Sequence, residues 1–131
     1  MNSIIKHLAI ATKLLNQPVA EEALAANIAR ELNLNANIQS LSEVLRSYGF
    51  ENHISRRKLI EIPSLAMPVV IILHNDEAAV VSEVKGRGEE RVYVIRSGDA
   101  PAHEVSHKEL ETQYLGFCWF IKPKLTADHR S

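Results

Sequence analysis

Cys118 is the only cysteine of the chain and the strongest candidate nucleophile among its side chains. It stands in Phe117-Cys118-Trp119-Phe120, a run typical of a strand in a protein core. A reactive thiol needs a lowered pKa, from a histidine partner or a helix N-terminus, and partial exposure. Because a strand interior supplies neither, we expect Cys118 to be packed and inert. A single cysteine also excludes an internal disulfide and a thiolate zinc site.

Two histidines have a spacing that can bind a metal ion. His103 and His107 lie four residues apart, which would place both on one face of a helix. No third ligand follows at a matching spacing and the HExxH pattern is absent, so we expect exposed histidines on a capped turn and no metal site. His7 is expected on the polar face of a first helix, and His53 precedes a basic stretch; neither has a recognisable partner.

Basic and glycine-rich segments are the remaining candidates for binding. Arg56-Arg57-Lys58 could contact phosphate, lipid headgroups or an acidic surface, although three charges in a loop are usually just solvated. The segment 86–88, Gly-Arg-Gly, lacks both GxGxxG and a Walker lysine, so it predicts a hairpin turn and not a phosphate cradle.

The first 47 residues predict three short helices. Apolar residues recur at spacings of three and four: Ile4, Ile5, Leu8, Ala11, Leu14 and Leu15, then Leu24, Ala25, Ile28 and Leu32. Pro18 separates the first two helices. Ser40 or Ser42 can cap the third helix, and Gly49 can end it.

The second half of the chain changes from helical to strand periodicity. Strands are predicted over 67–73 and 117–121, and a hairpin over 78–85 and 90–96. A short helix or turn over 103–114 contains Ser-His-Lys-Glu at 106–109, a capping box in form. Helices followed by an antiparallel sheet predict an α+β fold in one domain.

Composition limits the class of protein. The 131 residues suit one domain, and 46% hydrophobic with 24% charged residues is ordinary for a globular protein. Fifteen Lys and Arg against sixteen Asp and Glu give a net charge of -1, which argues against a nucleic-acid partner. We find no signal peptide and no apolar run long enough to cross a bilayer, and one cysteine suits a reducing, cytoplasmic environment.

The order of these features resembles one family, the N-terminal peptidase-like domain of bacterial ABC exporters. That domain is related to the bacteriocin-processing cysteine peptidases and has a papain-like cysteine-peptidase fold. The resemblance is carried by residues 8–19 (LAIATKLLNQPV) with 21–24, by 67–73 (MPVVIIL), by 78–81, and by the closing segments 106–110 and 114–116. It covers residues 1–123 as a peptidase-like domain, with 124–131 as a linker towards a transmembrane region.

The resemblance also implies that the catalytic positions are degenerate. The family's nucleophile, base and orienting positions fall near Ser3, at Glu77 or Ala78, and near Ser97. Active members have cysteine and histidine at the first two positions. Here His74 lies a few residues before the base position, and Asp99 lies two residues after the orienting position. A hydroxyl without a positioned imidazole is an ordinary alcohol, so we expect no catalysis by this domain.

Degenerate domains of this family occur on type I secretion exporters for RTX toxins and large adhesins, and residues 49–57 resemble that subgroup. The implied role is to hold an unfolded RTX-type secreted protein at the cytoplasmic face of the bacterial inner membrane. Expected partners are the exporter's own transmembrane and nucleotide-binding domains. The domain itself would need no cofactor, while ATP and Mg would bind the nucleotide-binding domain. Tyr48, Phe50 and Tyr93 are the candidate substrate contacts.

Two other functions remain as alternatives. A residual peptidase could cleave a leader peptide with Ser3 or Cys118, and Asp99 could take part. A small DNA-binding regulator could use the hairpin at 86–88 as the wing of a winged helix, although the near-zero net charge argues against it.

Overall fold

Three helices occupy the first 47 residues, as the apolar spacing predicted. They are α1 (Asn2–Leu14), α2 (Glu21–Ala25) and α3 (Leu34–Ser47) in a computed structural model that describes residues 1–26, 28, 34–97 and 100–125. After α1, the Thr12 hydroxyl accepts a hydrogen bond from the Val19 N–H at 2.9 Å, which fastens the turn leading to α2.

The start of α3 differs from the prediction. The helix begins at Leu34, so Ser40 and Ser42 lie inside it and do not cap it. Its end agrees with the prediction, because Gly49 has φ +92 and donates its N–H to the Arg46 carbonyl at 3.0 Å. Leu32, predicted in the buried stripe of the second helix, lies outside the described residues.

The second half of the chain forms one antiparallel sheet of six strands in the order β1-β6-β2-β3-β4-β5. The strands are β1 (Phe50–Arg56), β2 (Val69–Leu73), β3 (Ala78–Lys85), β4 (Val92–Arg96), β5 (His103–Ser106) and β6 (Tyr114–Pro123), with α4 (His107–Gln113) before the last. The α+β prediction is confirmed. The hairpin at 86–88 belongs to this larger sheet and is not the wing of a winged helix.

Two strands were missed by the sequence pattern. In β1 only Phe50 and Ile54 are apolar, because the strand lies at the edge of the sheet and most of its side chains reach solvent. In β5, the other edge strand, Val105 is the one buried residue. Strands of this kind lack the continuous apolar runs that mark the central strands.

The central strands are buried on both faces, which explains their unbroken apolar runs. Along β2 and β3, alternate side chains enter two separate cores. Val70 and Val80 pack with the helices and Trp119, whereas Ile71 and Val81 pack with the other core. That second core includes Tyr93, Ile95, Val105, Leu110 and Cys118.

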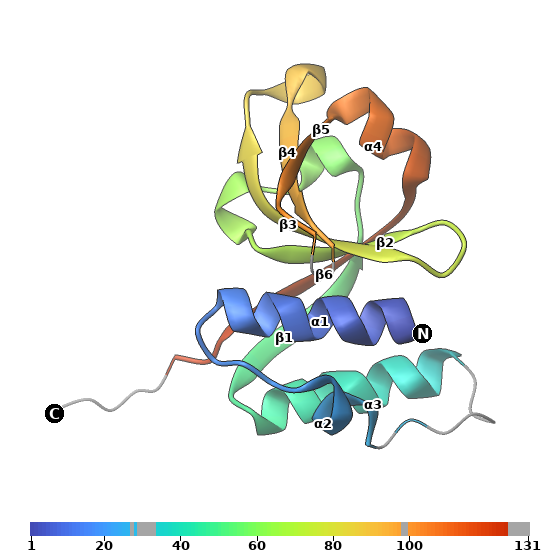
Figure 1. Ribbon diagram of the computed structural model, residues 1–131, viewed down its shortest axis with the longest axis vertical. Coiled ribbons are helices and arrows are strands. Elements are labelled where there is room, and N and C mark those ends of the chain that lie inside the picture. The colour runs from blue at the N-terminus through green and yellow to red at the C-terminus, as the bar shows by residue number, and fades with distance from the viewer. Residues whose placement is uncertain (27, 29–33, 98–99, 126–131) are drawn as a thin grey trace, which may run out of the picture.

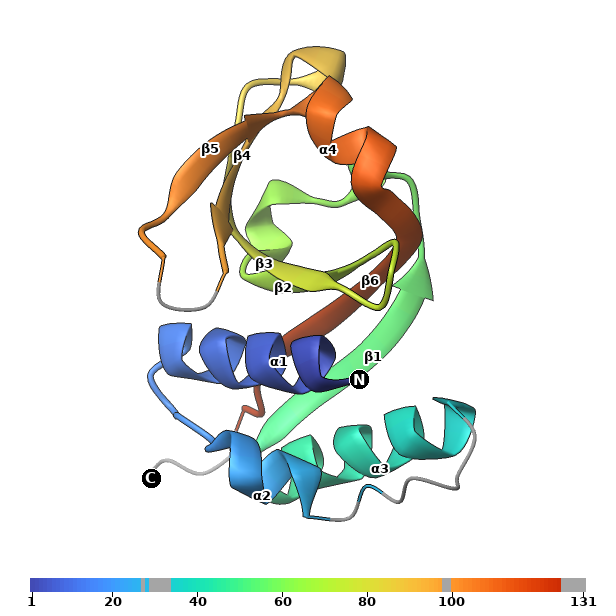
Figure 2. The same cartoon turned by 45° about the vertical axis from the view of Figure 1, so that its right-hand side comes forward.

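Helices α1, α2 and α3 lie at one end of the molecule, and α4 lies at the other (Figure 1, Figure 2). Figure 1 shows α1 lying across the sheet beside β2 and β3, with α2 and α3 beyond it. Figure 2 shows β4, β5 and α4 at the opposite end. Among the described residues, no helix is long and apolar enough to cross a membrane.

Candidate functional site

Ser3 lies in the first turn of α1 and links this helix to the beginning of β3. Its hydroxyl oxygen accepts a hydrogen bond from the Ala78 backbone N–H at 3.0 Å. The hydroxyl donates to the Glu77 carboxylate at 3.2 Å. Both partners are more than seventy residues away in sequence, so this contact exists only in the folded chain.

The tight turn between β2 and β3 places Glu77 and Ala78 beside Ser3. Asn75 and Asp76 adopt positive φ values of 63° and 59°, a conformation that Asn and Asp tolerate better than most residues. The Leu73 N–H donates to the Glu77 carbonyl at 2.9 Å and closes the turn. The turn therefore holds one carboxylate and one backbone N–H at the N-terminal end of α1.

His7 lies one helical turn after Ser3, and its ring nitrogen Nδ1 is closer to the Ser3 backbone carbonyl than to the Ser3 hydroxyl. His7 Nδ1 lies 2.6 Å from the Ser3 carbonyl oxygen, and a carbonyl can only accept, so Nδ1 carries the proton. The Ser3 hydroxyl oxygen is farther from Nδ1, at 3.4 Å. Burial lowers the pKa of His7, against the opposing effect of its backbone hydrogen bond. Its Nε2 is buried, with no hydrogen-bond partner in the described part of the chain.

The expected place of His7 was wrong. The side chain is 5% exposed and lies on the buried face of α1, although the apolar pattern placed it on the polar face. The signal that could have found it is the spacing of four between Ser3 and His7, which brings two residues together on one helix face.

Ser3, Glu77, Ala78 and Ser97 line one shallow hollow together with residues of α1. Four separate segments thus meet there: the start of α1, Glu21 at the start of α2, the turn before β3, and Ser97 just after β4. His74 is exposed on the same turn and lines a neighbouring hollow instead. Asp99 lies outside the described residues.

The contacts of Ser3 differ from those of an activated serine nucleophile. A serine nucleophile needs a base that takes its proton and a group that orients the base. Here the proton of Ser3 is directed to the exposed carboxylate of Glu77, and the nearby imidazole nitrogen already holds a proton. The oxygen of Ser3 is itself occupied by a backbone donor.

Cys118 is packed in the core, as predicted. It is fully buried in β6, and burial raises the pKa of its thiol to about 12. The thiolate, which is the nucleophilic form, is therefore scarce at neutral pH.

The prediction that His103 and His107 are both exposed was right for His103 and wrong for His107. His103 is exposed on β5, whereas His107 begins α4 and is 5% exposed. The His107 ring forms a buried hydrogen bond of 2.9 Å with the Tyr93 hydroxyl. Ser106 does cap α4, by accepting the Glu109 N–H at 3.2 Å. Within the described ranges, no group of three His, Cys, Asp or Glu side chains is placed to hold a metal ion.

Two of the three residues predicted to contact the substrate are buried, so the prediction was wrong for them. Phe50 is 1% exposed and packs in the core under the helices, and Tyr93 is fully buried in the other core. Neither side chain is available to a bound polypeptide. Tyr48, after α3, is 50% exposed and remains accessible.

Comparison with known proteins gives a match at the level of structure. No protein-family model and no curated protein sequence matches the chain. Among solved structures, the N-terminal peptidase C39 like domain of the toxin secretion ATP-binding protein from Vibrio parahaemolyticus superposes with a TM-score of 0.77 at 17% identity. The match covers 95% of this chain and 98% of that domain.

Two further structures match with similar coverage. A double glycine motif protease from an AMS/PCAT transporter, solved in complex with the leader peptide, gives a TM-score of 0.68 at 18% identity over 95% of this chain and 86% of that one. The peptidase domain of Streptococcus ComA, a bi-functional ABC transporter involved in a quorum sensing pathway, gives 0.71 at 14% identity over 94% and 92%.

The chain thus has the α+β fold of a peptidase domain. More particularly, it has the fold of the peptidase C39-like domains of ABC transporters, as the order of its sequence features implied.

Proposed function

We propose that this chain is a non-catalytic, peptidase-like domain of an ABC exporter and that it docks an unfolded polypeptide destined for export. The observation that carries the proposal is the state of Ser3. Its hydroxyl joins α1 to β3 through Ala78 and Glu77, and His7 is turned to a backbone carbonyl. A peptidase fold that keeps its surface but lacks an activated nucleophile can bind a chain without cutting it.

The solved relatives support the binding part of the proposal. One is described in complex with a leader peptide, and another is a domain of a toxin secretion ATP-binding protein. We extend these features to this chain as a docking role for a type I secretion substrate, such as an RTX toxin or a large adhesin. The domain would then work at the cytoplasmic face of the inner membrane, with ATP and Mg bound by the transporter's nucleotide-binding domain.

The experiment is a titration of the purified chain, labelled with ¹⁵N, with an unfolded C-terminal fragment of an RTX-type secreted protein. The same samples are examined by mass spectrometry for cleavage. We expect saturable changes in amide resonances with modest affinity and an intact fragment. Specific cleavage would refute the non-catalytic role, and the absence of any saturable change would refute docking.

A further inference from the structure

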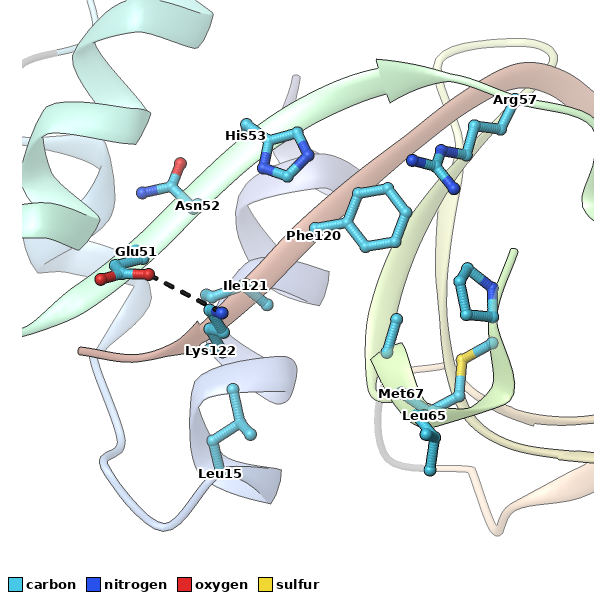
Figure 3. Close-up of a pocket in the computed structure, with 12 residues that line it drawn as sticks. Leu15, Glu51, Asn52, His53, Arg57, Leu65, Met67, Phe120, Ile121 and Lys122 are labelled. Atoms are coloured by element: carbon cyan, nitrogen blue, oxygen red, sulfur yellow. Dashed lines mark ion pairs between the residues drawn. The ribbon is translucent and has the colours of Figure 1, made fainter. Parts of the chain in front are cut away.

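A second hollow, which we call the Phe120 groove, lies at the other end of α1 from Ser3. It is bounded by β1 and β6 on one side and by the short helical turn η2 (Ser64–Ala66) on the other, as Figure 3 shows. Leu15, just after α1, reaches its edge. At a rise of about 1.5 Å per residue, Ser3 and Leu15 are about 18 Å apart along the helix. The groove is therefore separate from the hollow around Ser3.

The floor of the groove is an ordered stack of aromatic and cationic groups. His53 and Phe120 are directly opposite on β1 and β6, and their rings stack with centroids 5.1 Å apart. The Arg57 guanidinium lies 5.1 Å from the centroid of the same Phe120 ring, and Figure 3 shows Phe120 between the two. The backbone of Arg57 is fixed, because its carbonyl accepts the Tyr114 hydroxyl at 2.7 Å.

The Arg57 guanidinium keeps N–H donors that can bind an anion. Its side chain contacts the Ser55 hydroxyl at 3.4 Å, and no carboxylate of the described residues lies within ion-pair distance. Arg56 and Lys58 on either side also have no ion pair in this part of the chain. By contrast, Lys122 in the same groove is 3.8 Å from Glu51. A planar guanidinium held over an aromatic ring is well suited to a carboxylate.

The opposite wall is apolar and exposed. Leu65 is 98% exposed on η2, and Met67 lies beside it in the groove. An isolated exposed leucine is common on protein surfaces. Here, however, it faces a hollow of about 520 Å³ whose floor is the half-buried ring of Phe120. Such a hollow can accept an apolar side chain, and a flexible methionine adapts to its shape.

We propose that the Phe120 groove binds an extended, acidic polypeptide segment. An apolar side chain of that segment would lie between Leu65 and Phe120, with a neighbouring carboxylate on Arg57. The proposal rests on the proposed function and assigns its docking surface and the chemistry of its partner. The groove is a concave hollow, which suits an extended peptide better than a flat membrane surface.

The probe is a capped synthetic peptide, Gly-Ser-Asp-Glu-Phe-Asp-Glu-Ser-Gly, compared with a counterpart in which lysine replaces every acidic residue. Binding to the full chain is measured by amide resonance changes and by fluorescence anisotropy of a labelled peptide. We expect the acidic peptide to bind, to perturb amides of β1, β6 and η2, and to weaken as salt rises. The basic peptide should bind at least about tenfold more weakly.

Two variants test the two walls of the groove, each with a matched control. Arg57→Gln and Leu65→Ser should each weaken binding of the acidic peptide about tenfold. Arg87→Gln removes the same charge from the exposed turn before β4, and Leu115→Ser removes a leucine that is 46% exposed on β6 outside the groove. Both controls should bind like wild type. Amide spectra of all four variants verify that they are folded.

The outcomes separate this proposal from the proposed function. If the acidic peptide or the unfolded secreted fragment binds and neither groove variant differs from its control, the groove is not the docking surface and docking itself stands. Equal binding of both peptides overturns the acidic preference. If neither peptide nor fragment binds, both proposals fail. Binding to phosphatidylglycerol vesicles that Arg57→Gln abolishes, without peptide binding, would make the groove a membrane contact.

Discussion

Replacing Ser3 by alanine removes the hydroxyl that joins the first turn of α1 to the start of β3. The substitution leaves the Ala78 N–H without its acceptor and the Glu77 carboxylate without a donor. Ala78 is 4% exposed, so its N–H is poorly placed to find water. A buried donor left unpaired costs about 1–3 kcal/mol.

Two effects place the expected loss near the lower end of that range. Ser3 itself is partly exposed at the mouth of a hollow, so a water molecule can replace part of the lost contact. Alanine also has a higher helix propensity than serine, by up to about 0.5 kcal/mol. We therefore expect Ser3→Ala to lower the free energy of unfolding by about 1 kcal/mol, which corresponds to roughly 3–5 °C in Tm for a chain of this length.

Urea unfolding followed by fluorescence measures this loss, because Trp119 is the only tryptophan and is fully buried. Ser64→Ala, at an exposed serine on η2, is the control and should change stability by less than about 0.5 kcal/mol. Glu77→Gln should also have a small effect, since an amide oxygen still accepts from Ser3. A Ser3→Ala loss equal to that of the control would refute the structural role of this hydroxyl.

Three other measurements test the environments of buried groups. Cys118 should resist a thiol reagent at pH 8 in the folded chain and react in urea, because burial raises its pKa to about 12; rapid labelling of the folded chain would contradict this. Folding lowers the pKa of His7, so the unfolded chain binds the proton more tightly than the folded chain does. The stability contributed by neutral His7 is therefore lost as the pH falls below about 6.5, the ordinary pKa of histidine. The loss of unfolding free energy between pH 7.5 and about 5.5 should therefore be smaller in His7→Asn than in wild type, and an equal loss would exclude His7 as its source. Tyr93→Phe should cost about 1–3 kcal/mol in urea unfolding by leaving His107 Nδ1 buried and unpaired, whereas Tyr48→Phe at an exposed ring should cost almost nothing; equal effects would contradict a structural role for that bond.

Helix α1 connects the two surfaces on which the functional proposals rest. Its first turn is fastened to β3 through Ser3, and Leu15 beyond its last turn lines the Phe120 groove. A change at Ser3 that moves the helix would therefore alter the groove as well. Peptide binding by Ser3→Ala measured beside its stability will show whether the helix keeps its position.

Periodicity and local chemistry were sufficient for much of the fold. Apolar spacing in α1, the apolar run of β2, and the Ser106 cap of α4 depend on residues close together in the sequence, and all three are present. The burial of Cys118 followed from its aromatic neighbours for the same reason.

Contacts between segments that are distant in the sequence determined the features of the fold and of the sites that the sequence pattern did not predict. Strand β6 enters the sheet between β1 and β2, and only this insertion pairs Phe120 with His53 and brings Arg57 over the ring. Tertiary packing also buries Phe50 and Tyr93, whose aromatic side chains could equally have served as a binding surface. One of the two distant partners of the Ser3 hydroxyl is a backbone N–H, which every residue except proline carries and which no side-chain pattern can mark.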